Sequence, residues 1–131
     1  MASVLKVDTI TGVTTAGSIS VTGEGNSTTT NLQQGLAKAW ANGTATATVN
    51  DSFNVSAGTD HGTGDYTLTV TNNFTSVNYA MTATGRGNTA GHIVTRNVAR
   101  GAAGTLAVEI ETDAGAAGDF AFDCNVHGDL A

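Results

Sequence analysis

The clearest pattern of apolar and polar positions lies in the stretch from Leu36 to Val70. Its run from Gly62 to Asp65 offers residues that tolerate a positive φ angle. After this run, Tyr66, Leu68 and Val70 alternate with threonines. A period of two is typical of a strand with one buried face. The sequence therefore predicts a tight turn followed by a half-buried strand.

Further short apolar segments follow one another, separated by glycines and asparagines. Asn42 and Gly43 form a good hairpin-turn pair before the first of them. Short strands in quick succession, with no long helical window, predict an all-β fold, an antiparallel β-sandwich or jelly-roll-like domain. The predicted strands cover residues 44–49, 52–56, 65–71, 78–84, 92–98, 105–112 and 119–127.

The first residues predict a separate N-terminal segment. Residues 3–10 read as a short strand, residues 13–22 as a second extended piece, and the polar run 26–31 as a linker. We therefore expect an attachment segment and linker over 1–31 and a β-sandwich domain over 32–131. In the first strand the alternating side chains form two faces, with Val4, Lys6 and Asp8 on one and Leu5, Val7 and Ile10 on the other.

The segment from Leu32 to Trp40 is ambiguous. Apolar residues at 32, 36 and 40 fit one stripe of a helix. Gly35 lies inside this stripe, however, and Leu36, Lys38 and Trp40 equally form one face of a strand. We expect an extended chain from Ala37 onward, since the sequence that follows is strand-like.

The composition gives this chain a thin core. Hydrophobic residues make up 40% of the 131 residues, below the usual fraction of about 45–50%. Small side chains bury little apolar area against the entropy lost on folding. Burial between subunits is the obvious supplement, so we expect a homo-oligomer. The expected anchors of the core or of a subunit interface are Trp40, Phe53, Tyr66 and Leu68.

Charge and hydropathy exclude several partners. The formal net charge is −6, from 5 basic and 11 acidic residues, so we expect neither nucleic acid nor an anionic membrane as a partner. No apolar run approaches the roughly 18 residues of a membrane span. Lys6 and Asp8 stand where a signal peptide needs an apolar run. We therefore expect synthesis in the cytoplasm, without membrane insertion.

Candidate chemical groups do not form a known catalytic or metal-binding motif. His61, His92 and His127 are not closely spaced, and Cys124 with His127 supplies at most two zinc ligands. Cys124 shares a predicted strand face with Phe122 and Val126, which favours a buried thiol. We expect no enzyme activity and no cofactor. The possibility stays open that one histidine from each subunit holds an ion at a symmetry axis.

Several blocks carry a resemblance to a known group of proteins. The opening from Ala2 to Ile10 resembles the N-terminus of small fibre-type and virion structural proteins of tailed bacteriophages, especially those of aquatic hosts. Four further blocks are similar to the distal domain of that group. They are Gly35 to Trp40, Asp51 to Ser56, Gly62 to Tyr66 and Val126 to Ala131.

This resemblance implies a trimeric β-structured head or tail appendage of the virion, attached to the particle by its N-terminal segment. The chain has no long shaft, so a compact head decoration or a tail-fibre knob fits better than an extended fibre. The partners would then be other virion proteins of the capsid or tail. The alternative is a receptor- or carbohydrate-binding module at a fibre tip, which would need exposed aromatic side chains to stack on host surface glycans.

The attachment segment allows a specific hypothesis. Residues 3–10 have no obvious hairpin mate, so they could add a strand to the sheet edge of another virion protein. The other possibility is that Leu5, Val7 and Ile10 belong to the sheet of the domain itself.

Overall fold

The computed structural model describes residues 4–12, 19–23, 28–87, 92–96 and 101–130. The chain divides into two compact units, Met1–Leu36 and Ala37–Ala131. The division thus lies between Leu36 and Ala37 rather than between 31 and 32. The reason is local, because the four-residue helix α1 (Leu32–Gly35) packs against the preceding strand and belongs to the first unit.

The N-terminal unit contains a short antiparallel hairpin of β1 (Ser20–Thr22) and β2 (Thr29–Asn31). Two backbone hydrogen bonds extend it, from Gly23 N to Thr28 O at 2.8 Å and from Leu32 N to Ile19 O at 2.8 Å. The polar run 26–31 is therefore not only a linker, since its last three residues form β2. Threonine suits this role because its branched Cβ favours the extended backbone.

The described residues 4–12 belong to no strand, so the prediction of a strand over 3–10 is wrong for the described part of that segment. A strand needs a partner for its backbone N–H and C=O groups. Among the described residues, β1 and β2 form a sheet of two strands, and residues 4–12 stay exposed.

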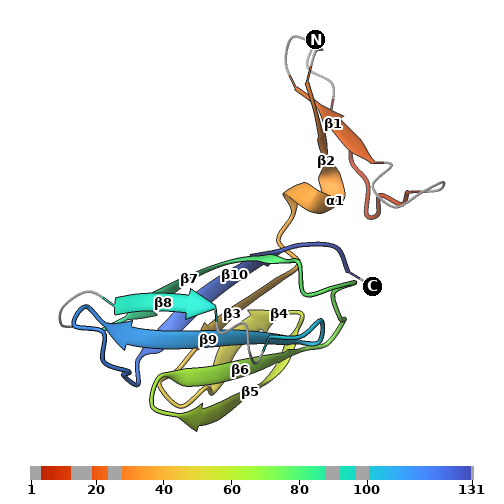
Figure 1. Ribbon diagram of the computed structural model, residues 1–131. Coiled ribbons are helices and arrows are strands. Elements are labelled where there is room, and N and C mark those ends of the chain that lie inside the picture. Colours follow the sequence, from red (N-terminus) through yellow and green to blue (C-terminus); the bar gives the residue numbers. More distant parts are fainter. Residues whose placement is uncertain (1–3, 13–18, 24–27, 88–91, 97–100, 131) are drawn as a thin grey trace. The chain divides into compact units, whose positions relative to one another are not determined.

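The second unit is an antiparallel β-sandwich, which confirms the predicted all-β fold. Figure 1 shows the β5-β6-β9-β8 sheet as one layer and the β4-β3-β10-β7 sheet as the other. Every neighbouring pair of strands within the two sheets is antiparallel. The strands are β3 (Ala39–Gly43), β4 (Val49–Phe53), β5 (Val55–Gly62), β6 (Asp65–Val70), β7 (Ala80–Arg86), β8 (His92–Arg96), β9 (Thr105–Thr112) and β10 (Ala121–His127).

Asn54 forms a one-residue connection between the two sheets. It is the single residue between β4 and β5, which belong to different sheets, and its φ is 58°. Asparagine visits this left-handed region more readily than most residues. Its side chain also fixes the corner, since Nδ2 donates to Lys38 O at 3.0 Å and Oδ1 accepts from Asn72 N at 2.7 Å.

Strand positions after residue 65 were largely predictable, whereas the first two predicted strands were misplaced. Residues 44–48 form a turn rather than a strand, and Asn42 and Gly43 lie inside β3 rather than in a turn. The Thr44 hydroxyl accepts hydrogen bonds from the backbone N–H groups of Thr46 and Thr48 at 3.3 and 3.1 Å. Such local hydroxyl bonds compete with strand pairing and favour a turn.

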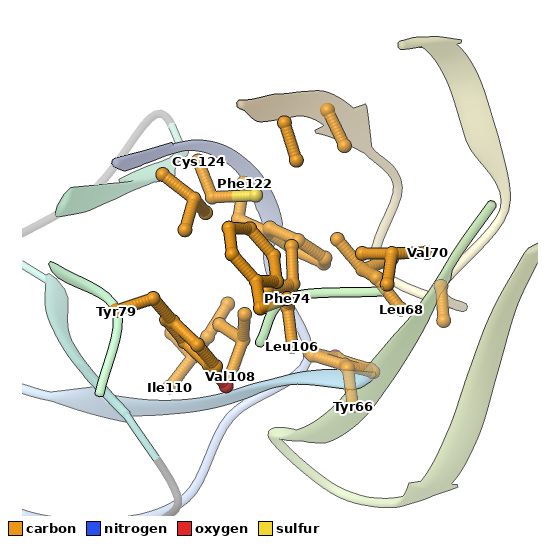
Figure 2. Packing of buried hydrophobic residues seen from close by; sticks show 14 residues of the cluster. Tyr66, Leu68, Val70, Phe74, Tyr79, Leu106, Val108, Ile110, Phe122 and Cys124 are labelled. Carbon is orange, nitrogen blue, oxygen red and sulfur yellow. The ribbon is translucent and has the colours of Figure 1, made fainter. Parts of the chain in front are cut away.

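The core lies between the two sheets. Tyr66 from β6 and Phe122 from β10 stack across the layers, with ring centroids 5.4 Å apart and planes 17° apart. Phe74 and Tyr79 form a second aromatic pair at 4.9 Å. Figure 2 shows these side chains together with Leu68, Leu106, Val108 and Ile110. Tyr66 and Leu68 are fully buried, as expected of core anchors.

Trp40 and Phe53 are not core residues of the single chain, which corrects the core half of the prediction; their expected role as anchors of a subunit interface stays a prediction. Their side chains are 38% and 52% exposed. In β3 the inward positions belong to Ala39 and Ala41, which are almost completely buried. The ring of Phe122 lies so close to Gly43 that a Cβ there would be 2.6 Å from it. Phe122 thus leaves no room for a side chain at Gly43.

Gly64 allows a test of the packing at the turn between β5 and β6. Its φ is 73°, and a Cβ would collide with Ile110 O. Gly115 has nearly the same φ of 75° but open space around it. We expect Gly115→Ala to lower the free energy of unfolding by about 1–2 kcal/mol through backbone strain, and Gly64→Ala by about 1–3 kcal/mol more through the clash. Urea unfolding of both variants measures the difference, and equal losses would contradict it.

Cys124 gives a pH dependence of stability. Burial, with a smaller contribution from the charge of Asp123, raises the pKa of this thiol from 9.0 to about 11. The unfolded thiol ionises first as the pH rises, so the stabilisation is complete below pH 9 and is lost toward pH 11. We expect the free energy of unfolding to fall by about 1 kcal/mol between pH 9 and 10.

The control for this pH dependence is Cys124→Ala, which lacks the thiol. Its free energy of unfolding should fall less steeply between pH 9 and 10 than that of the wild type. Ionisation of Tyr66 lowers the free energy of unfolding at higher pH. Burial, and then the hydrogen bond to Asp119, raises the pKa of Tyr66 above its usual 10.0. Equal slopes for the wild type and Cys124→Ala between pH 9 and 10 would refute the assignment to Cys124.

Candidate binding surface on a sheet face

The described residues hold no group of three or more histidine, cysteine or carboxylate side chains that is arranged to bind a metal ion. His61 lies on β5, exposed, with Nε2 2.9 Å from the Thr67 hydroxyl. His127 lies at the end of β10, and the side chain of His92 is outside the described part. Cys124 is buried beside Phe122 and Val126, as its position in the strand predicted.

The carboxylate of Asp119 is hydrogen-bonded to other parts of the sandwich. Its Oδ1 accepts hydrogen bonds from Gly64 N at 2.8 Å and from the Tyr66 hydroxyl at 3.1 Å. The same hydroxyl lies 3.0 Å from Ala45 O, a second acceptor for its single proton. These contacts tie the turn after β5 to the segment before β10. The Asp119 carboxylate therefore has a structural role, because it holds this turn and the Tyr66 hydroxyl in place.

The outer face of the β4-β3-β10-β7 sheet is a better candidate for a binding surface than these single side chains. The strand register shows which residues it contains. Inward residues of β10 alternate with Asp123 and Asn125, just as Ala39 and Ala41 alternate with Trp40 and Asn42. Directly paired residues therefore form two rows across the outer face. The aromatic row is Phe53, Trp40, Asn125 and Thr82, and the polar row is Asp51, Asn42, Asp123 and Thr84.

The aromatic row places two exposed rings next to each other. Trp40 and Phe53 are direct partners in the register of β3 and β4. Neighbouring strands lie about 4.8 Å apart, so the two side chains leave the sheet from adjacent strands. Asn125 and Thr82 continue the row with exposed polar side chains. The row thus offers an apolar half and a hydrogen-bonding half.

A β-bulge adds a polar side chain to this face. The register between β3 and β4 shifts at Asn42 and Gly43, so Asn50 is an extra residue without a direct partner. A bulge lets two successive residues oppose one on the partner strand. Asn50 therefore turns toward the outer face, where its Nδ2 donates to Asn42 Oδ1 at 2.9 Å.

Asn42 is the centre of a hydrogen-bond network. Its Nδ2 donates to Asp123 Oδ1 at 2.7 Å, and its Oδ1 also accepts from Arg86 Nη2 at 3.0 Å. Arg86 additionally donates to Gly43 O at 3.0 Å and contacts Asp123 Oδ2 through Nε at 3.2 Å. This ion pair is half exposed, so its energy is small. Its main effect is to hold the polar row in one orientation beside the aromatic row.

The second candidate surface is the segment 4–12. All six residues predicted to attach the protein, Val4, Leu5, Lys6, Val7, Asp8 and Ile10, are exposed there. The four apolar ones are each more than half exposed. Exposed apolar side chains gathered in one short segment are typical of a contact with a partner.

Sequence reasoning missed Asn42, Asp123, Asn125 and Arg86 as members of one surface. A signal was present, because the predicted inward set Phe122, Cys124 and Val126 requires Asp123 and Asn125 to point outward. The neighbouring strands were not predictable from this pattern. The pairing of β10 with β3 and β7 joins segments distant in the sequence.

Comparisons with known proteins add no relative. No family model, no curated protein and no solved structure matches the chain.

The only helix in the described part has four residues, and no described helix has the length and apolarity to cross a membrane.

The outward position of Phe53 predicts a small effect of its removal. We expect Phe53→Ala to lower the free energy of unfolding by about 1 kcal/mol or less, because surface changes have small effects. Leu106→Ala, which removes a fully buried side chain, should cost about 2–5 kcal/mol. Urea unfolding compares the two variants. A large loss for Phe53→Ala that depends on protein concentration would instead place this ring in a subunit interface.

Proposed function

We propose that this protein is a bacteriophage virion structural protein without enzyme activity. It is a small trimeric β appendage, a head decoration or fibre, or a tail-fibre knob, joined to the particle by its N-terminal segment. The observation that carries the proposal is the exposed apolar segment 4–12, in a chain whose β-sandwich is a separate compact unit. The resemblance of the opening and of the distal blocks to phage virion proteins supports it.

Attachment would use the apolar side chains of the segment and its backbone, which belongs to no strand. A segment that belongs to no strand can gain backbone hydrogen bonds by adding to the sheet edge of another protein. Val4, Leu5, Val7 and Ile10 would lose their exposed apolar area at the same time. A virion protein of the capsid or tail is the proposed partner.

The shortage of large apolar side chains supports association of subunits, and the resemblance to phage virion proteins supports three of them. In the described part of the sandwich, much of the inward surface consists of small or medium side chains around a few aromatic rings. Association of three copies buries further area and supplements this core. The mass of the intact protein in solution should then be three times the 13.1 kDa of one chain.

Deletion of residues 2–12 tests attachment. We expect the shortened protein to remain folded and trimeric, because the deleted residues lie outside both the hairpin and the sandwich. It should no longer join the particle, because the attachment segment is gone. Light scattering measures the mass, and protein analysis of purified particles measures incorporation.

A matched control for this deletion is the full-length protein with Lys6 and Asp8 replaced by serine, which keeps all the apolar side chains and should still be incorporated. Normal incorporation of the deletion variant would refute the attachment role. A monomeric full-length protein would refute the trimer while leaving the attachment result to stand separately.

A further inference from the structure

We propose that the outer face of the β4-β3-β10-β7 sheet binds a neutral glycan. Trp40 and Phe53 stack on sugar rings, and polar side chains of the two rows bond the sugar hydroxyl groups. The proposal goes beyond a structural role in the virion. It does not depend on attachment to a particle, because every residue that it uses belongs to the sandwich unit.

The two rings provide the apolar part of the surface. Trp40 and Phe53 are exposed although burial is the usual fate of large aromatic side chains. Tryptophan combines a large flat face with an N–H donor, which suits a ligand that is partly apolar and partly polar. The C–H faces of pyranose rings are ligands of this kind. The partners stand on adjacent strands, so an oligosaccharide crossing them meets one ring after the other.

Polar groups lie where the hydroxyl groups of such a ligand would be. The exposed side chain of Asn125 is beside Trp40 in the same row and makes no hydrogen bond within the described part of the chain. Asp51 lies in the neighbouring row, next to Phe53 along β4, and is also exposed. An amide offers both donors and acceptors, and a carboxylate accepts two or more bonds, which matches hydroxyl groups that donate and accept.

The surface is held in place before any ligand arrives. The bonds among Asn42, Asn50, Asp123 and Arg86 fix the polar row, and β-strands rather than loops carry both rows. Less side-chain freedom is then lost on binding, which favours affinity.

The charge of this face selects a neutral ligand. Asp123 is paired with Arg86, whereas the exposed carboxylate of Asp51 has no cation among its direct partners in the register. The whole chain carries a net charge of −6. An acidic saccharide would meet repulsion here, and a neutral one would not.

A second copy of the chain fits this face less well. Stable interfaces between identical subunits are mostly apolar at their centre and depleted of charge. Here the two rings are surrounded by asparagine, aspartate, threonine and an ion pair. Burying these groups against a copy with the same charges would cost more than the two rings return.

The experiment uses the purified full chain on an array of neutral oligosaccharides of glucose, xylose, mannose and galactose, with sialylated and uronic-acid glycans alongside. Trp40 is the only tryptophan, so its fluorescence reports binding at this face when a neutral glycan from the array is titrated in solution. We expect binding to neutral glycans, a change of Trp40 emission and a loss of at least tenfold in affinity for Phe53→Ala and for Asn125→Ala. Trp40→Ala should abolish binding on the array.

His61→Ala is the matched control, since it removes an exposed ring from β5 in the other sheet and should leave affinity unchanged. Circular dichroism confirms that each variant is folded, and Asn125→Ala keeps the test decisive if a ring variant is not. Three results would overturn the proposal. They are an array without any neutral-glycan signal, binding that survives Phe53→Ala and Asn125→Ala, and a reduced oligomeric mass of Trp40→Ala, which would assign the rings to a second copy. Particle incorporation is measured separately, so this proposal and the virion role can fail independently.

Discussion

The stack of Tyr66 on Phe122 is the contact on which the rest of the sandwich depends. It joins the centre of one sheet to the centre of the other, and the Tyr66 hydroxyl anchors one end of it to Asp119. The ring of Phe122 also occupies the space above Gly43, and the other inward residues of β3, Ala39 and Ala41, are small as well. Because side chains alternate along a strand, the large residue Trp40 must then point outward.

This alternation along the strands gives the two faces of the β4-β3-β10-β7 sheet different roles. The inner face supplies the apolar area that holds the layers together, while the outer face of the β4-β3-β10-β7 sheet is left free to carry rings and bonded polar groups. The two rows of this face consist largely of exposed or half-exposed side chains. The proposed glycan site uses this outer face, and the proposed attachment uses the exposed segment 4–12.

The local sequence was sufficient where a strand carries its own complete pattern. The strand from Asp65 to Val70 follows a glycine-containing turn and alternates without a break, and the strand from Thr105 to Thr112 was predicted with its observed bounds. Burial of Cys124 followed from the alternation with Phe122 and Val126. The local sequence was insufficient at residues 44–48, where hydroxyl-to-backbone bonds outweigh the strand preference of threonine. It was also insufficient at residues 4–10, which alternate but have no partner strand within the described part of the chain.

The sequence by itself determined the all-β class, the shortage of large apolar side chains and the positions of the later strands, because these depend on residue type and local period. Only the tertiary structure decided which side of β3 faces the core: Ala39, Ala41 and Gly43 are inward, and the Phe122 ring fills the space above Gly43. It also decided that Asn42, Arg86 and Asp123 meet, because strand pairing brings these distant residues to one face. Long-range pairing is a property of the whole fold, and no local pattern encodes it.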